Sequence, residues 1–133
     1  MKELMQAIYT RYNTSTTFKG LLATGAFYYG RGKQDGALPY CVYTSGETIN
    51  EDTFKKTISE VTIQMNLYTE SDTTSSTCFD LLEACRLLFE DQVLTVTDYY
   101  DVLLTKIMEI PPMNIDGIKW MAVIEFNCLL QKK

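Results

Sequence analysis

Residues 61–68 read VTIQMNLY, and this stretch decides the fold class. Apolar and polar residues alternate along it, which is the period-two pattern of a strand with one buried face. A different pattern follows within residues 74–89, where apolar residues recur every three or four positions: Cys78, Leu81, Leu82, Cys85, Leu88 and Phe89. This spacing puts them on one stripe of an amphipathic helix. We therefore expect a half-buried strand that leads into a helix.

The C-terminal third of the chain predicts further strands. Residues 118–130 alternate over their whole length, and their apolar face consists of Ile118, Trp120, Ala122, Ile124, Phe126, Cys128 and Leu130. Residues 92–96 and 99–110 are shorter or less regular strand candidates. Pro111 and Pro112 should interrupt the second of these, because neither proline can donate a hydrogen bond to a strand ladder.

The N-terminal part of the chain begins with a helical pattern at residues 2–12. Glycines punctuate residues 20–36, so we expect turns there around a short strand at residues 26–29. Pro39 opens a strand over residues 40–45, which are rich in aromatic and β-branched side chains. The next residues, from Gly46 to Asn50, read as a loop.

This order of elements predicts an α+β fold class, with a single, mostly antiparallel β-sheet and two α-helices packed on one face. The length of 133 residues fits one domain that spans residues 1–133. Neither an internal repeat nor a linker is visible in the sequence.

The charge balance bears on the class of partner. The formal net charge is −5, and lysine and arginine are scattered rather than gathered in a stripe. Specific binding to nucleic acid is disfavoured, because such binders gain affinity by neutralising phosphates. The N-terminus lacks the apolar core of a signal peptide, and no apolar run approaches the roughly 18 residues of a membrane span. We expect folding in the cytoplasm and no membrane contact.

The side chains that catalysis requires are missing or dispersed. The chain has no histidine, and its acidic residues are spread along the sequence. Four cysteines form no CxxC pair, so zinc and disulfide frameworks are not expected and the thiols read as core residues. The stretch Gly30-Arg31-Gly32-Lys33 departs from a phosphate-binding loop, because Gln34 stands where Ser or Thr is needed. These observations predict no enzyme activity, no metal and no cofactor.

Three stretches together resemble a known protein family. They are the helical segment 4–9, the segment FYYGRG (27–32) that leads to ALPYCVY (37–43), and the alternating strand 61–68 followed by the helix 78–89. The segment 37–43 looks like the LPY-V-Y hallmark of bacteriophage tail-completion proteins. The chain thus resembles the phage tail-completion or tail-terminator family, which joins tail to head.

The resemblance implies a structural role in the neck of a virion. Proteins of this family form a hexameric ring that caps the tail tube, ends its polymerisation and presents a surface to the head connector. The implied partners are copies of the same chain, the tail tube protein and a head connector or completion protein. DNA would pass through the ring without specific binding, and assembly would take place in the host cytoplasm. The family has no catalytic residues to carry over.

Two segments are candidates for contacts with partners or with other copies. Both are rich in glycine or charged residues and lie next to clearly predicted strands. We therefore hypothesise that they contact neighbouring rings and become ordered on docking. The candidate residues are Gly30, Arg31, Gly32, Lys33, Gln34, Asp35, Gly36, Glu47, Glu51 and Asp52. Two other functions stay open: a head-completion or connector protein of the same neck, and a small ligand-binding or enzymatic α+β domain.

Overall fold

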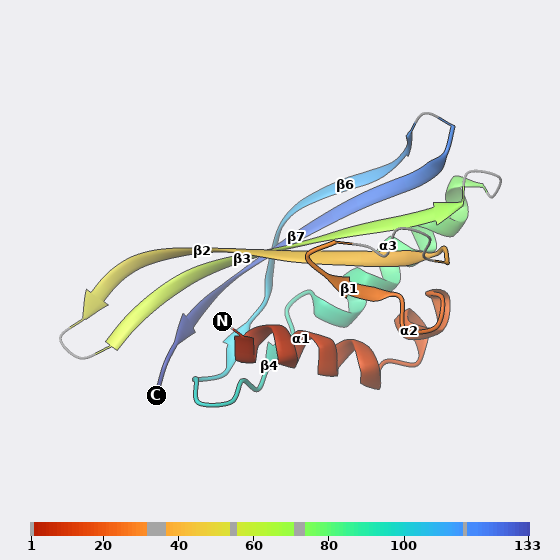
Figure 1. Ribbon diagram of the computed structural model, residues 1–133. Helices are drawn as coiled ribbons and strands as arrows, with labels where there is room; N and C mark the ends of the chain where they lie inside the picture. Colours follow the sequence, from red (N-terminus) through yellow and green to blue (C-terminus); the bar gives the residue numbers. More distant parts are fainter. Residues whose placement is uncertain (1, 32–36, 54–55, 71–73, 116) are drawn as a thin grey trace.

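A computed structural model of the chain describes residues 2–31, 37–53, 56–70, 74–115 and 117–133. The described helices are α1 (Lys2–Thr14), α2 (Thr17–Leu21) and α3 (Ser75–Phe89). The described strands are β1 (Phe27–Tyr29), β2 (Tyr40–Thr53), β3 (Lys56–Glu70), β4 (Val93–Leu94), β5 (Val102–Leu103), β6 (Thr105–Ile115) and β7 (Lys119–Gln131). The α+β class is therefore confirmed, with helices and sheet arranged in two layers (Figure 1).

The main sheet has five strands within the described residues, in the order β1-β2-β3-β7-β6. Three of its four pairings are antiparallel, whereas β1 runs parallel to β2. The sheet is therefore mixed, because the chain crosses over between β1 and β2 instead of turning back as a hairpin. A separate two-stranded sheet joins β4 and β5.

The prediction of two helices is wrong, because the described residues contain three. The additional helix is α2, which spans only Thr17–Leu21. It begins beside a local hydrogen bond in which Phe18 N donates to Ser15 Oγ over 3.1 Å. Its apolar content is too small for a periodic pattern, yet it buries Phe18 completely.

The prediction that residues 46–50 form a loop is also wrong. They continue β2, which pairs with β3 from Tyr40 opposite Tyr68 to Thr53 opposite Lys56. The register with β3 shifts between Ile49 and Glu51, where a β-bulge accommodates one extra residue in β2. Pairing with β3 thus overrides the weak strand propensity of these polar residues.

The two prolines do not end their strand as expected. β6 runs through Pro111 and Pro112, and its register with β7 shifts between Ile110 and Met113. β6 is the last strand of the sheet, so a proline there need not donate to a neighbour on the outer side. The edge position explains why the strand survives.

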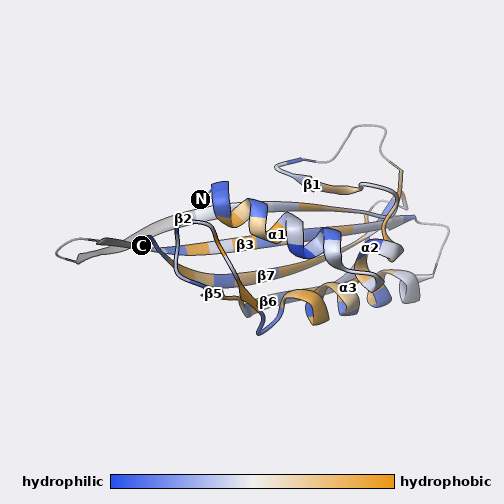
Figure 2. Cartoon of the chain, turned by 90° about the horizontal axis from the view of Figure 1, so that it is seen from below, coloured by the Kyte–Doolittle hydropathy of each residue, from blue (hydrophilic) through white to orange (hydrophobic). Residues whose placement is uncertain are grey.

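One face of the sheet carries the core. Buried side chains alternate along β3 and along the second half of β7, and they meet the buried residues of all three described helices in a single cluster. Phe27 lies at its centre, with its ring stacked at 4.4 Å on both Tyr12 and Tyr43. Phe18 and Phe89 approach the same ring at 6.0 and 6.4 Å. Aromatic contacts of this kind join α1, α2 and α3 to the sheet, and Figure 2 shows the three helices over one of its faces.

The β2–β3 hairpin extends beyond the helical layer. In Figure 1 these two strands run past α1 and β4 before they end. Pairing between β3 and β7 continues from Glu70 opposite Lys119 to Ile58 opposite Gln131, so β7 supports the hairpin over most of its length. The sheet is therefore longer than the helices that cover it.

Candidate assembly surface

The first candidate surface is the outer edge of β2. β1 pairs only with Cys41, Val42 and Tyr43, which leaves the stretch 44–53 without a paired strand on that side among the described residues. Unpaired strand edges present rows of N–H and C=O groups that another chain can pair with. This edge therefore offers a backbone template.

The second surface is the outer edge of β6, at the opposite side of the sheet. β6 pairs with β7 on one side only within the described ranges. The Glu109 carboxylate on this strand lies 3.8 Å from both Arg86 of α3 and Lys106, so two basic groups share one acidic group near the edge. These pairs are partly exposed and contribute little to stability.

Exposed apolar side chains border the β6 edge. Leu103, Ile107 and Leu129 are 50%, 51% and 60% exposed, and they line a hollow of about 420 Å³ together with Asp101, Thr105, Asn127 and Cys128. We call Leu103, Ile107 and Leu129 the apolar patch. Sequence reasoning missed it. Strict alternation in β7 does place Leu129 opposite to the core face, whereas Ile107 lies in a register shift that hides its direction.

The predicted loop residues lie partly outside the described ranges. Gly32, Lys33, Gln34, Asp35 and Gly36 belong to the residues that are not described. Gly30 has a positive φ of 86°, which favours glycine, and its N–H donates to Tyr43 O over 2.9 Å. Arg31 is exposed beside it. The described part of this segment thus lies at the point where the open edge of β2 begins.

The three acidic candidates belong to β2 rather than to a loop. Glu47 pairs with Val61, and Glu51 and Asp52 pair with Ile58 and Thr57. Their backbone therefore lies along the same edge that Gly30 borders. The structure thus brings Gly30 and Arg31 to the same side of the sheet as the backbone of these three acidic residues.

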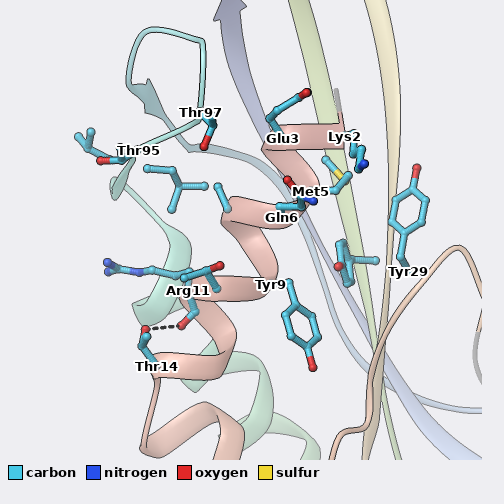
Figure 3. A pocket seen from close by; sticks show the side chains of 15 residues that line it. Lys2, Glu3, Met5, Gln6, Tyr9, Arg11, Thr14, Tyr29, Thr95 and Thr97 are labelled. Carbon is cyan, nitrogen blue, oxygen red and sulfur yellow. Dashed lines mark hydrogen bonds between the residues drawn. The ribbon is translucent and has the colours of Figure 1, made fainter.

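A larger hollow of about 1140 Å³ follows helix α1 (Figure 3). Thr95 and Thr97 lie on one side of the helix, whereas Tyr9 and Tyr29 lie on the other. The Arg11 side chain is held by hydrogen bonds within the fold, because its guanidinium donates to Leu88 O over 3.1 Å and to Gln92 Oε1 over 2.8 Å. The hollow is thus a groove along a helix, lined mainly by hydroxyl, aromatic and aliphatic groups.

The sheet face opposite the helices carries a cluster of tyrosines. The Tyr40 ring lies 4.9 Å from Tyr68 and 6.0 Å from Tyr28. Lys119 Nζ lies within 5.3 Å of the first two rings and donates to Tyr40 Oη over 2.9 Å. This amine is therefore held by a hydroxyl and two aromatic faces.

The four thiols are free and buried, which confirms that they are core residues. Burial raises the pKa of Cys41 and Cys85 well above the ordinary value, and that of Cys128 to about 11. Burial also raises the pKa of Cys78. All four are therefore protonated at neutral pH, a state in which a thiol is a poor nucleophile.

Side chains that bind metals do not gather in the described ranges. No three His, Cys, Asp or Glu side chains among them come together in a group that could hold a metal ion. None of the described helices combines the length and the apolar character that crossing a membrane requires. The candidate site is therefore the pair of strand edges with the apolar patch.

Comparison with known proteins gives matches in structure only. No family model and no curated protein matches the sequence. A chain from the virion of a native gene transfer agent (GTA) particle is similar with a TM-score of 0.80, over 98% of this chain and 96% of that chain, at 13% identity. A second solved chain, which carries no functional description, has a TM-score of 0.66 over 99% and 96% of the two chains, at 15% identity. At these identities the similarity shows a shared fold.

Proposed function

We propose that this chain is a structural protein of a phage-like virion neck, which caps the tail tube as a ring, ends its polymerisation and joins the tail to the head. One observation carries the proposal: the chain matches a component of a gene transfer agent virion over nearly its full length, with a TM-score of 0.80. The role is that of a non-enzymatic scaffold, in which shape and strand edges supply the function.

Two further features support the tail-terminator role over other virion roles. The segments FYYGRG and ALPYCVY resemble the tail-completion family, and the described part of both lies along β1 and the start of β2. That is the border of the open β2 edge, where another subunit has access to the backbone. The partners we propose are further copies in a hexameric ring, the tail tube protein on one side and a head connector on the other.

The charge of the chain suits a conduit for DNA. A net charge of −5 weakens attraction to phosphates. On the sheet face away from the helices, the Lys119 amine is held by Tyr40 and Tyr68, as described above. DNA that passes such a surface is not retained. The proposed location is the neck of the virion, after assembly in the host cytoplasm.

The segment 30–36 and the acidic residues Glu47, Glu51 and Asp52 are the proposed contacts to neighbouring rings. Deletion of residues 31–35 should leave the unfolding temperature of the chain unchanged and prevent the joining of heads to tails. The measurement is the yield of complete particles by electron microscopy. A normal yield of joined particles would remove this segment from the interface.

Particles assembled without the chain test the function itself. A tail terminator is required to stop polymerisation, so its omission should give overlong tail tubes and free heads. Tails of normal length beside unjoined or leaking heads would instead identify a head-completion or connector protein. Particles that form normally would contradict a role in the neck. Complementation with the unaltered chain is the control.

A further inference from the structure

The geometry points to head-to-tail pairing between the open β2 edge of one copy and the β6 edge of the next, so that the sheets of neighbouring subunits become continuous. This inference rests on the proposed function, because it specifies how identical subunits of the ring join. Four observations carry it: the position of both open edges, their direction, the outward backbone groups of β2 and the apolar patch.

Within the described residues, both edges are open at the same end of the sheet. Thr44 aligns across the sheet with Gln64, Glu125 and Met108, and the next two rows run from Ser45 to Lys106 and from Gly46 to Thr105. In these rows β1 is absent from one edge, and the other edge contains no proline. We call this region the open end.

The rows beyond it are closed on the β2 side, and β6 reaches its two prolines at the far end of these rows. β1 covers β2 at Cys41–Tyr43, and the same rows reach β6 from Glu109 to the register shift that contains Pro111 and Pro112. Proline and short covering strands are the devices with which proteins prevent pairing at an edge. We call this region the closed end. Both strand edges are thus protected against pairing at the closed end, by β1 on β2 and by the prolines in β6. Among the described residues, neither device is present at the open end.

The strand directions favour head-to-tail pairing of identical subunits. β2, β3, β7 and β6 are antiparallel to one another in turn, so β2 and β6 run in opposite directions. When a second copy follows in the same orientation, its β2 edge meets the first copy's β6 edge as an antiparallel pair. Antiparallel pairing is the slightly more stable arrangement. Repeated head-to-tail contacts of this kind close into rings when the rotation allows it.

The backbone of β2 offers the necessary groups. Cys41 N donates to Ala26 O over 3.0 Å and Tyr43 O accepts from Gly30 N over 2.9 Å, so both residues turn their backbone groups toward the β1 side. Side-to-side alternation along a strand assigns the same direction to Ser45, which lies past the end of β1. Its N–H and C=O are therefore the first pair that an added strand would engage.

The apolar patch lies beside the corresponding part of β6. Leu129 stands next to the Asn127–Thr105 row of β7, and Leu103 and Ile107 flank Thr105 along the chain. A strand added at Thr105–Met108, in the rows of the open end, would lie beside Ile107 and close to Leu103 and Leu129. Burial of apolar surface would then add to the backbone hydrogen bonds at the contact. The occupant we propose is a second copy of this chain, because its β2 edge runs antiparallel to β6 when the two copies have the same orientation.

Two variants test the two edges separately, one for β2 and one for β6. Ser45→Pro deletes an outward N–H that β3 does not use, and Ser45→Ala is its matched control, because both lose the hydroxyl that lies 3.0 Å from Tyr29 Oη. Ile107→Lys places a charge on the β6 edge, and Met113→Lys is its control in the closed half of the same strand, where Met113 is 44% exposed. Thermal unfolding verifies that each variant folds, and the Ile107 pair carries the test if Ser45→Pro does not fold.

Solution mass by ultracentrifugation is the measurement. The unaltered chain and both controls should associate with increasing concentration, and each edge variant should weaken association at least about tenfold. A mixture of Ser45→Pro and Ile107→Lys should form a one-to-one dimer, because each variant keeps the edge that the other lacks. An unaltered chain that stays monomeric at its highest soluble concentration would overturn the pairing. So would a Ser45→Pro chain that associates normally, or a mixture that does not pair.

The two proposals fail in different ways. If omission of the chain gives overlong tails while the edge variants associate normally, the neck function stands and the edge pairing is wrong. If the variants behave as expected while particles assemble normally without the chain, the pairing stands and the neck function is wrong.

Discussion

The closed and open ends of the sheet differ in how their strand edges are protected. At the closed end β1 covers the edge of β2, β6 carries Pro111 and Pro112, and the Phe27 aromatic cluster joins the described helices to the strands. At the open end strand edges and apolar side chains remain available. The core crosses both ends, since Ile63 and Phe126 in the Ser45–Lys106 row are fully buried, whereas the two ends differ in how their strand edges are protected.

The largest expected effect comes from the aromatic cluster. Phe27→Ala removes a ring that is 3% exposed and stacked on two others, which should cost about 3–5 kcal/mol of unfolding free energy. Chemical denaturation measures the loss. Tyr29→Ala is the matched control in the same strand, since Tyr29 is 53% exposed. Equal losses in the two variants would contradict the assignment of stability to this cluster.

A loss of stability in alkaline solution is the next effect. Burial raises the pKa of Tyr43 from 10.0 to about 12. The unfolded chain therefore releases this proton first, and stability that is present below pH 10 is lost as the pH rises toward about 12. Buried thiols act in the same direction. Denaturation midpoints across this range measure the slope, and Tyr43→Phe should make it shallower. If stability depends on pH equally steeply in that variant, a group other than Tyr43 is responsible for the alkaline loss.

The lysine on the opposite face should contribute less. Lys119→Met removes the hydrogen bond to Tyr40 and the contacts with two rings, at a cost of about 1 kcal/mol. A double-mutant cycle with Tyr40→Phe isolates the pair. Strict additivity of the two substitutions would show that the pair contributes nothing.

The smallest effect on folding is expected at the open end. Leu129→Lys changes a side chain that is 60% exposed, so the unfolding free energy should stay within about 0.5 kcal/mol of the original value. The same substitution should weaken association of the chains, which ultracentrifugation detects. A strong loss of monomer stability would mean that the patch belongs to the core of the fold.

Much of the fold could be predicted from local patterns. The core face of β7 was predictable because Ala122, Ile124 and Phe126 recur at every second position and are fully buried as expected, although Val123 between them is buried too. The helix at 74–89 was predictable for the same reason, and α3 spans Ser75–Phe89. Both elements bury one face, and this burial leaves a periodic signal in the sequence.

The remaining features depend on contacts that no local pattern encodes. Strand structure at Glu47, Glu51 and Asp52 comes from pairing with β3, and the persistence of β6 through Pro111 comes from its edge position. The parallel pairing of β1 requires a crossover whose outcome the sequence does not reveal. The open edges are properties of the strand order, so sequence reasoning could indicate long strands but could not place their free sides.

Electron cryomicroscopy of particles assembled with this chain tests the central claim most directly. The account predicts a single ring of copies between the end of the tail tube and the head, with sheets continuous from β2 of one subunit to β6 of the next. Copies distributed along the tube or within the head shell, or particles that lack the chain altogether, would contradict it.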